Sequence, residues 1–400
     1  MEITSMSFEA PTDSASSVLE LLAVGHTWSK IAAGLQTRLP DTLPRILLLD
    51  GIVTRLTGWG ILATGHIASV FARDLALLPS EARLVAVGSR SLERAMAFAA
   101  DHGISRAYDS YAELAGDPDV DVVYVASPHH DHFASAKLCL EAGKSVLVEK
   151  PMTINAADTA ELINRARDRG LFLMEALWTR TNPLIRKAAA LAASGDLGDI
   201  RHVSADFGFA FRGPGTHRLL DPALAGGAIL DAGVYPLHVV NLFLGEPTDL
   251  FGFGSRASTG VDSHAAALLT YPATDERSAA TATVICSLDA DLPTGLQVYG
   301  SFGRIMINDF FIRPKEMLVY RGHHRDVAPE VLVTQWPGGG YTFQAQEVMR
   351  CIRAGELESP MVPWRDSLAV ARTLALWQAA VGDAVAQQDD SPQEESQWSG

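Results

Sequence analysis

Trp59-Gly60-Ile61-Leu62-Ala63-Thr64-Gly65-His66-Ile67-Ala68 is an apolar run that turns at a glycine and continues into a second apolar segment. A dinucleotide site needs a tight turn, a glycine where the backbone approaches the pyrophosphate, and a small residue where the helix packs on the strand. Ala63, Gly65 and Ala68 occupy these three positions. A chance glycine turn would explain the run nearly as well, but its place between a strand-like and a helix-like segment favours a nucleotide loop. Gly65, His66 and Ile67 would then begin a helix whose N-terminus binds the cofactor phosphates.

Short strand-like and helix-like segments alternate downstream of this loop. The strand-like segments are 59–63, 84–87, 120–126, 145–148 and 171–175, and the helix-like ones are 67–78, 91–102, 111–114, 133–141 and 155–169. Short apolar runs that alternate with helices are typical of a parallel sheet covered on both faces. The sequence therefore predicts an α/β Rossmann domain with a doubly wound sheet.

The pattern changes after residue 180. Val203, Ala205, Phe207, Phe209 and Phe211 are apolar at every second position, which is the period of a half-buried strand. Further strand-like runs are 265–271, 280–288, 296–299, 304–307 and 317–320, and a final helix is expected at 364–386. We expect an α+β domain with a large, mostly antiparallel open sheet and few helices.

The length of 400 residues exceeds what one hydrophobic core serves, so two domains are expected. We place a nucleotide-binding domain at 58–178 and a second domain at 179–386. Residues 1–57 form an extension to which we assign no role; within it, 18–35 is amphipathic, and 46–49 could form an extra strand or a short helix. Residues 387–400 are polar and acidic, and we expect them to be disordered.

Composition argues against several partners. The net charge of -15 argues against nucleic acid, since phosphate binding needs clustered Lys and Arg. Cys139, Cys286 and Cys351 lie far apart without CxxC spacing, which favours reduced thiols and a cytoplasmic location. No apolar run reaches the roughly 18 residues of a membrane span, so we expect no membrane partner. Acidic residues precede the first Lys or Arg, which is wrong for a secretory signal.

Glu149-Lys150-Pro151 follows the strand-like run 145–148. A lysine before a proline is usually a surface loop residue. At the carboxyl end of a strand, in a sheet that already carries a nucleotide loop, it lies where such sheets bind ligands. Pro151 also disfavours the helical conformation at Lys150, so an extended backbone could aim the ammonium into the crevice.

The residues after the second strand bear on cofactor preference. An acid that binds the ribose 2′-OH is expected there, yet the chain has Gly88-Ser89-Arg90-Ser91 and no acid before Glu93. Ser89 and Arg90 could bind a 2′-phosphate instead, because arginine makes charge-assisted hydrogen bonds to phosphate. A solvated Arg90 at a helix start is the alternative. The missing acid favours NADP over NAD.

Ser127-Pro128-His129-His130-Asp131-His132 follows the strand 120–126 and so lies at the same edge. Three histidines and an aspartate suggest a metal site, but structural zinc sites usually take separated ligand pairs with a cysteine contribution. A polar loop that contacts the cofactor through Ser127, His129 and His132, or caps the next helix, is the preferred interpretation. We predict no metal.

Gly226-Gly227-Ala228-Ile229-Leu230-Asp231-Ala232-Gly233-Val234-Tyr235-Pro236-Leu237-His238 combines dense glycine with polar residues. Glycine lets a backbone approach a ligand closely. On a helix, Asp231 and Tyr235 would share one face, although Pro236 should kink or interrupt that helix. An ordinary glycine-rich turn would explain the glycines but not the interleaved polar residues.

Together these motifs resemble the Gfo/Idh/MocA oxidoreductase family. Lys150 in Glu-Lys-Pro, the run 143–148 before it, and the Gly-Gly-x-x-x-Asp-x-Gly-x-Tyr-Pro run at 226–236 carry the resemblance. Met174-Glu175-Ala176-Leu177-Trp178-Thr179-Arg180 and Arg218-Leu219-Leu220-Asp221-Pro222 narrow it to the branch of trans-dihydrodiol and D-xylose dehydrogenases. The resemblance spans residues 58–386 and leaves the first 57 uncovered.

The resemblance implies hydride transfer from the carbinol carbon of a sugar or cyclic diol to the nicotinamide of NADP. Lys150 would contact the substrate hydroxyl and the cofactor, Tyr235 would transfer the proton, and Asp231 would orient the pair. The cofactor and substrate cleft would also be lined by Glu149, His132, Trp178 and Arg180. The second domain would hold the substrate and form a homodimer through its sheet.

Two departures from the family pattern and one electrostatic question remain. Ala63 replaces the usual first glycine, which puts cofactor affinity rather than the fold in question, and His129 replaces the usual asparagine. Tyrosine has an ordinary pKa of about 10, which a nearby Lys150 would lower and Asp231 would raise. The sequence leaves open which of the two prevails.

Two other functions compete with the dehydrogenase. An NADP-binding regulatory protein could have kept the fold and lost turnover, but the retention of Lys150, Asp231 and Tyr235 together argues against it. A lyase or hydrolase that works through transient oxidation would need a further acid/base or metal cluster, for which the sequence offers no convincing candidate.

Overall fold

This computed structural model describes residues 46–49, 52–275, 277–322 and 328–389. Contacts divide the chain into two compact units, 1–56 and 57–400. In the first unit, strands β1 (Ile46–Leu49) and β2 (Ile52–Arg55) pair antiparallel, so 46–49 adopts the strand of its two predicted alternatives. The predictions for 18–35 and for the tail beyond 389 lie outside the described residues.

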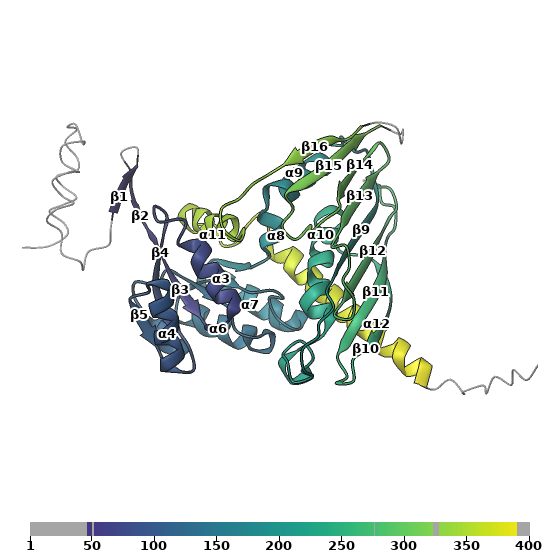
Figure 1. The fold of residues 1–400 in the computed structure, drawn as a ribbon. Coiled ribbons are helices and arrows are strands. Elements are labelled where there is room, and N and C mark those ends of the chain that lie inside the picture. Colours follow the sequence, from purple (N-terminus) through teal and green to yellow (C-terminus); the bar gives the residue numbers. More distant parts are fainter. Residues whose placement is uncertain (1–45, 50–51, 276, 323–327, 390–400) are drawn as a thin grey trace, which may run out of the picture. The chain divides into compact units, whose positions relative to one another are not determined.

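A parallel sheet opens the second unit (Figure 1). Its strands are β3 (Thr57–Leu62), β4 (Ala82–Gly88), β5 (Arg106–Tyr108), β6 (Val122–Val125), β7 (Ser145–Val148) and β8 (Leu173–Glu175). Among the described residues their order is β5-β4-β3-β6-β7-β8, and neighbouring strands are parallel. The strand order reverses between β3 and β6, so the loops after them leave a crevice at the carboxyl edge. The predicted Rossmann sheet is confirmed.

Helices connect these strands and bury both faces of the sheet. They are α3 (His66–Leu75), α4 (Leu92–His102), α5 (Tyr111–Gly116), the 3-10 turn η1 (His129–Asp131), α6 (His132–Glu141) and α7 (Ala156–Arg169). Neighbouring residues of a strand belong to two different hydrophobic clusters. Ile61 is in the cluster that contains Phe71 of α3, whereas Leu62 is in the cluster that contains Leu140 of α6. Because the strands are buried on both faces, they are apolar throughout rather than alternating.

Local sequence signals set the ends of these helices. The Asn155 side chain accepts the Asp158 N–H at 2.8 Å and so caps α7, as its position predicts. Gly103 and Gly170 end α4 and α7 in the left-handed region, with φ of 66° and 63°. Glycine adopts this conformation without a side-chain clash, which explains why both helices stop where they do.

A second sheet is large and mostly antiparallel, as predicted. Its strands are β9 (Ile200–Gly208), β10 (Asp249–Arg256), β11 (Asp262–Tyr271), β12 (Ala280–Ser287), β13 (Leu296–Gly300), β14 (Gly303–Ile307), β15 (Glu316–Arg321) and β16 (Glu330–Val333). In the described part of the chain the order is β10-β11-β12-β9-β13-β14-β15-β16, with β9 and β12 parallel.

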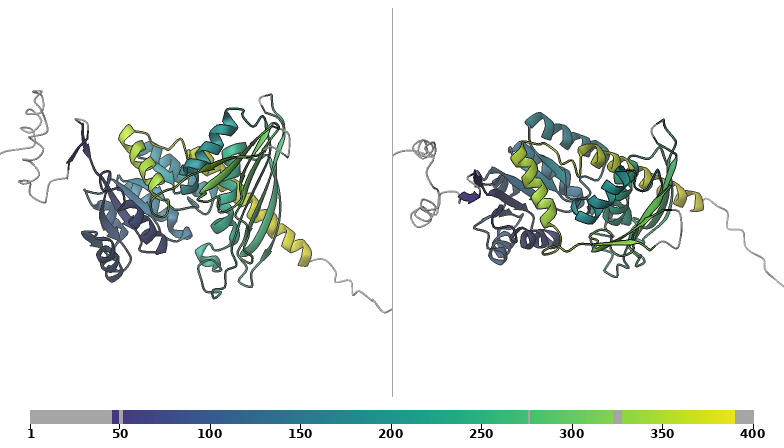
Figure 2. Two further views of the ribbon diagram at one scale, coloured as in Figure 1. Left: turned by 45° about the horizontal axis from the view of Figure 1, so that its top comes forward. Right: turned by 90° about the horizontal axis from the view of Figure 1, so that it is seen from above.

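Helices lie along one face of this sheet (Figure 2). The helical segments of this half are α8 (Trp178–Thr181), α9 (Pro183–Ala193), η2 (Pro222–Leu224), a π-helical turn η3 (Ile229–Gly233), α10 (Val234–Leu244), α11 (Thr342–Ala354) and α12 (Trp364–Asp389). α10 and α12 cover the inner face, while Phe251 and Phe253 of β10 are exposed. α12 extends to Asp389, three residues past the predicted end at Ala386.

Strands β2, β5, β10 and β16 and helices α8, α9 and α11 were not predicted. β10 contains Gly252 and Gly254, which weaken a strand signal. A Cβ at Gly252 would lie 3.0 Å from Trp377 of α12, and one at Gly254 would lie 2.4 Å from the His264 carbonyl oxygen of β11 and 3.1 Å from Val381 of α12. These glycines therefore let α12 pack closely on the sheet, a tertiary reason that the local sequence does not carry.

One described segment, Pro222–Leu244, is long and apolar enough to cross a membrane by length and composition. However, 78% of its most apolar window is buried inside the protein, where α10 packs against the second sheet. A core helix meets the same criteria, so this segment supports no membrane assignment.

Candidate active site

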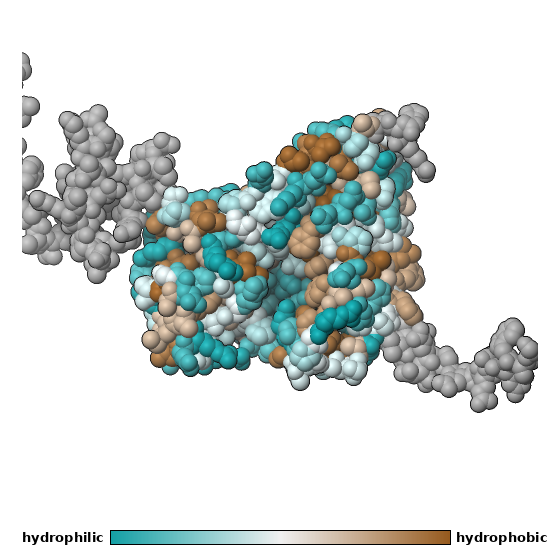
Figure 3. Space-filling model, viewed as in Figure 1, coloured by the Kyte–Doolittle hydropathy of each residue, from teal (hydrophilic) through white to brown (hydrophobic). Residues whose placement is uncertain are grey.

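A cleft of about 930 Å³ lies at the carboxyl edge of the parallel sheet, where the strand order reverses. It is visible as the central hollow of the molecular surface (Figure 3). The loops after β3, β4, β6 and β7 line one side. Phe207, Arg218, Asp231, Tyr235 and Phe310, all from the second half of the chain, line the other. The cleft therefore brings most of the predicted site residues together.

The nucleotide loop has the geometry of a phosphate cradle. Ala63 has a φ of 75°, the left-handed conformation for which the first glycine of the pattern is usually needed. Gly65 is the N-cap of α3 and makes no side-chain cap, so the first N–H groups of the helix remain available to an anion. A Cβ at Gly65 would meet nothing within 4 Å, so the loop faces open space. The loop thus fits a dinucleotide, with Ala63 bearing backbone strain.

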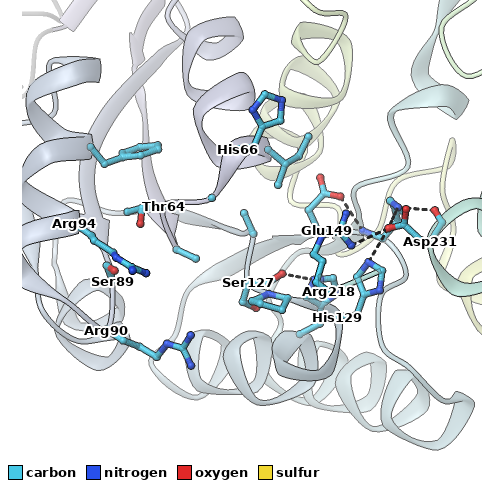
Figure 4. Close-up of a pocket in the computed structure, with 18 of the residues that line it drawn as sticks. Thr64, His66, Ser89, Arg90, Arg94, Ser127, His129, Glu149, Arg218 and Asp231 are labelled. Carbon is cyan, nitrogen blue, oxygen red and sulfur yellow. Dashed lines mark hydrogen bonds and ion pairs between the residues drawn. The ribbon is translucent and has the colours of Figure 1, made fainter. Parts of the chain in front are cut away.

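Two arginines flank Ser89 at one end of the cleft (Figure 4). Arg90 and Ser89 were predicted from the sequence, whereas Arg94 was not. Arg94 lies in the first turn of α4, four residues after Arg90, which precedes the helix, and the Arg94 N–H donates to the N-cap Ser91 at 3.4 Å. The i, i+4 spacing of two arginines at a helix start was the available signal. This end of the cleft is the one where a 2′-phosphate would lie.

Lys150 lies at the other end of the cleft, on the loop after β7. The Lys150–Pro151 peptide bond is cis. Lys150 Nζ donates to the Asp231 carbonyl oxygen at 2.8 Å and lies 3.4 Å from Asp231 Oδ1. It also lies 5.0 Å from the centre of the Tyr235 ring. Lys150 therefore contacts both of the other two predicted catalytic residues, Asp231 and Tyr235.

Asp231 is surrounded by cationic and polar nitrogens. Besides Lys150, Arg218 Nη1 lies 3.0 Å and His129 Nε2 lies 3.6 Å from Asp231 Oδ1, as the dashed lines of Figure 4 indicate. Burial alone would raise the pKa of the Asp231 carboxyl, but Lys150, His129 and Arg218 together lower it well below its usual range. Burial, reinforced by Lys150, lowers the pKa of His129 to about 3. Asp231 is thus a permanent anion beside a neutral histidine.

Tyr235 is buried, and its hydroxyl receives one hydrogen bond from the protein in the described residues. Trp178 Nε1–H donates to it at 3.3 Å. Burial raises the pKa of Tyr235 well above its ordinary value, and the Glu149 and Asp231 charges raise it further against the effect of Trp178. The sequence set Lys150 against Asp231, but burial and Glu149 have the largest effects on this pKa, and in the free protein Tyr235 is a neutral phenol.

Asp231 and Tyr235 face the cleft together because of an irregular helix. Asp231 lies in the π-helical turn η3, and Tyr235 lies in the first turn of α10. Pro236 lacks the N–H that would bond back to the preceding turn, and that turn is the π-helical η3, so the predicted interruption of the helix lies directly before the proline. The irregularity precedes the proline, and π-helical turns of this kind are frequent at functional sites.

Buried polar contacts hold the cleft loops in place. The Tyr124 hydroxyl donates to Glu149 Oε1 at 2.5 Å, and the Lys150 N–H donates to Glu149 Oε2 at 3.2 Å. The two ring nitrogens of His132 lie 2.8 Å from the carbonyl oxygens of Ser127 and Pro151. Burial lowers the pKa of His132, and the contacts with these two carbonyl oxygens oppose that effect; the ring links the loops after β6 and β7. His132 therefore holds the loop after β6 and the loop after β7 together.

Arg180 does not line the cleft, unlike the other predicted residues. Its side chain is 3% exposed, and its Nη2 lies 2.6 Å from Asp366 Oδ2 at the start of α12. Sequence proximity to Trp178 suggested a cleft residue, but α8 turns Arg180 toward α12 instead. The described residues contain no group of three or more His, Cys, Asp or Glu side chains that could hold a metal ion.

Comparisons with known proteins agree with this geometry. The family model "Oxidoreductase family, NAD-binding Rossmann fold" matches residues 57–177, and the model "GFO/IDH/MocA C-terminal domain" matches residues 185–306. Trans-1,2-dihydrobenzene-1,2-diol dehydrogenase of Bos taurus is 40% identical over 331 residues, which cover 81% of this chain and 96% of that protein.

Two further proteins extend the comparison. D-xylose 1-dehydrogenase (NADP(+)) of Hypocrea jecorina is 35% identical over 353 residues, which cover 79% of this chain and 90% of that protein. Among solved structures, aldose-aldose oxidoreductase of Caulobacter crescentus, complexed with glycerol, has a TM-score of 0.73 at 26% identity. That match covers 82% of this chain and 98% of the other.

Proposed function

The chain belongs to the GFO/IDH/MocA oxidoreductase family, and from this premise we propose that it is an NADP-dependent dehydrogenase that oxidises a CH–OH group of a sugar or cyclic diol. The observation that carries the proposal is the convergence of Lys150, Asp231 and Tyr235 at one end of the cleft that begins at the nucleotide loop. A D-xylose-like aldose and a trans-dihydrodiol are the substrates suggested by the relatives.

The reaction removes a hydride from the carbinol carbon and a proton from its hydroxyl. The bound nicotinamide supplies the hydride acceptor. We assign proton transfer to the Tyr235 hydroxyl and stabilisation of the developing negative oxygen to Lys150 Nζ. Asp231 orients Lys150 through the contacts at 2.8 and 3.4 Å and balances its charge. A neutral Tyr235 is ready to donate a proton in the reductive direction, and oxidation requires its phenolate to form beside Lys150.

The preference for NADP rests on the adenosine end of the cleft. Ser89, Arg90 and Arg94 line it, and two guanidinium groups suit a 2′-phosphate dianion better than a ribose hydroxyl. The Hypocrea jecorina relative carries NADP(+) in its name. We expect Arg90→Ala to weaken NADP+ binding more than NAD+ binding, and an equal loss for both would argue against this assignment.

A homodimer through the second sheet is also proposed. Phe251 is 65% and Phe253 is 56% exposed on the face of β10 that α12 does not cover. Adjacent exposed aromatics suit a protein interface. Sedimentation of the wild type and of Phe251→Asp tests this, since a dimer that persists unchanged in the variant would exclude this face. A cytoplasmic location stays a proposal too, and it agrees with the buried, unpaired thiols of Cys139, Cys286 and Cys351.

The experiment that tests the function measures nicotinamide reduction by the purified protein with NADP+ against a panel of aldoses and cyclic diols. Lys150→Ala, measured in parallel, should lose turnover and keep most of its NADPH affinity. Tight NADPH binding without turnover on any panel member would instead favour the catalytically silent regulatory protein. Complete loss of NADPH binding in a folded Lys150→Ala variant would contradict the role assigned to Lys150.

A further inference from the structure

A second hollow, of about 1060 Å³, lies beside the cleft. It is formed by the loop between β14 and β15 and by the segment that follows β16. Asn308, Asp309, Phe310, Arg313 and Trp336 are among the residues that line it. None of the proposed chemical steps uses this hollow.

An aromatic wall joins the hollow to the reacting residues. Phe310 lines both spaces. Its ring meets Phe207 edge to face at 6.4 Å, and Phe207 meets Tyr235 in the same way at 5.6 Å. On the side of the hollow, the Arg313 guanidinium lies 5.5 Å from the Phe310 ring centre. Phe310 has a φ of 46°, a strained conformation of the kind that clusters at functional sites.

A glycine provides a second connection. A Cβ at Gly340 would lie 3.3 Å from Trp178 and 3.3 Å from Trp336, so the two indoles flank this one residue. Trp178 lines the cleft, and Trp336 lines the hollow. The backbone at Gly340 therefore lies between one indole of the cleft wall and one indole of the hollow wall.

The segment that carries Trp336 is held in a fixed position. Asp74 of α3, which is 4% exposed, accepts N–H bonds from Gly339 at 2.7 Å and from Tyr341 at 2.8 Å. Arg313 Nη1 donates to the Gly339 carbonyl oxygen at 3.3 Å. A Cβ at Gly338 would lie 2.2 Å from Asp74 Oδ1, so the glycine run is required by this approach. The hollow is thus preformed rather than a gap beside a free loop.

The chemistry of the hollow suits a hydroxylated ring. The half-buried Trp336 offers an apolar face, and the side chains of Asn308, Asp309 and Arg313 offer donors and acceptors around it. Few polar groups placed around an aromatic surface are typical of small-molecule sites. Resting on the proposed dehydrogenase function, we propose that this hollow binds the second ring of a disaccharide or glycoside whose first ring reacts at Lys150 and Tyr235.

The test compares D-xylose with xylobiose as substrates of the protein with NADP+. The ratio of kcat/KM for xylobiose to kcat/KM for D-xylose should fall about tenfold in Trp336→Ala, because a sugar ring loses its stacking surface. Trp336→Phe, which keeps an aromatic face, should retain most of the ratio. Leu376→Ala, an exposed change on α12 away from both spaces, is the matched control and should leave the ratio unchanged.

Binding of xylobiose to the NADPH-loaded protein, followed by saturation-transfer NMR, separates the two proposals. If D-xylose is oxidised while the xylobiose ratio and binding do not depend on Trp336, the second-ring site is wrong and the dehydrogenase stands. If neither sugar is oxidised while xylobiose binds in a Trp336-dependent way, the sugar dehydrogenase is wrong and the binding site stands. Absence of both turnover and binding contradicts both.

Discussion

The indole N–H of Trp178 lies within hydrogen-bond distance of the Tyr235 hydroxyl, 3.3 Å away, and the Trp178 ring stacks on Tyr341 at 4.2 Å. The hydrogen bond opposes the effect of burial on the pKa of Tyr235. Trp178→Phe keeps the stack and removes the bond. A hydrogen bond to a charged group contributes about 1.5–3 kcal/mol, so oxidative kcat should fall roughly ten- to a hundredfold.

A matched substitution tests whether that loss is specific. Trp364 is another buried tryptophan, and its Nε1–H donates to the Leu173 carbonyl oxygen at 2.8 Å, outside the cleft. Trp364→Phe should lower thermal stability and leave kcat near the wild-type value. Equal kcat losses in the two variants would mean that the Trp178 bond has no particular role at Tyr235.

The raised pKa of Tyr235 gives a pH dependence with a definite sign. Oxidation of an alcohol requires a proton acceptor, and the acceptor form of Tyr235 is populated only as the pH approaches its pKa. Oxidative kcat should therefore rise with pH beyond the neutral range and not level off below about pH 10. Tyr235→Phe should remove this rise and lower kcat on the order of 10²–10⁴-fold. A plateau near neutral pH, identical in wild type and variant, would assign the proton to another group.

Ala63 combines strain with cofactor binding. A non-glycine residue at its φ of 75° costs about 1 kcal/mol, and the structure requires that φ in the nucleotide loop. Ala63→Gly should raise the free energy of unfolding by about 1 kcal/mol or slightly less, because glycine also loses more entropy on folding. Chemical denaturation measures this. Ala68→Gly, inside α3, is the opposite control and should destabilise the protein.

Asp74 should affect catalysis without touching the substrate. Its carboxylate accepts the N–H groups of Gly339 and Tyr341, and Tyr341 supports Trp178. Asp74→Asn replaces one acceptor oxygen with a donor, so the segment should shift and release Trp178. We expect kcat to fall several-fold while the dissociation constant of NADPH changes little. A large loss of NADPH affinity with unchanged kcat would show that Asp74 acts on α3 and the cofactor instead.

Glu175 and His238 form a buried pair, in which His238 Nε2 lies 3.1 Å from Glu175 Oε2. Burial alone would raise the pKa of Glu175, but His238 and the hydrogen bond from the Met152 N–H lower it. A lowered folded pKa means that the ionised Glu175 adds stability above its unfolded pKa of about 4.3, and that this stability is lost as the pH falls below it. Unfolding free energies of wild type and Glu175→Gln should therefore converge below about pH 4. A difference that stays constant with pH would contradict this.

Much of the fold follows from local sequence signals. The apolar strands, the caps at Ser91 and Asn155 and the glycine ends of α4 and α7 are local features, and the structure confirms the elements they predicted. β10 was missed because its glycines weaken the strand signal, and the close packing of β11 and α12 that they allow depends on contacts with later parts of the chain. The sequence cannot show such a contact.

In the candidate site, too, some residues can be predicted from local sequence and others depend on long-range contacts. Gly65 and Lys150 lie directly after strands, so the topology alone brings them to the cleft. Arg180 lies only two residues after Trp178, and the direction of α8 decides that it pairs with Asp366 instead. The sequence does not predict the role of Asp74 and the glycine run 338–340, because that role depends on a contact between α3 and a segment more than 260 residues later.

The central claim is that this protein removes a hydride from a carbinol carbon and transfers it to NADP+. The most direct test is a single-turnover reaction with a sugar or cyclic diol that carries deuterium at that carbon, followed by mass spectrometry of the nucleotide. We predict one deuterium in the NADPH formed by the wild type and none with Lys150→Ala. Tight NADPH binding with no label transferred from any substrate of the panel would contradict the account.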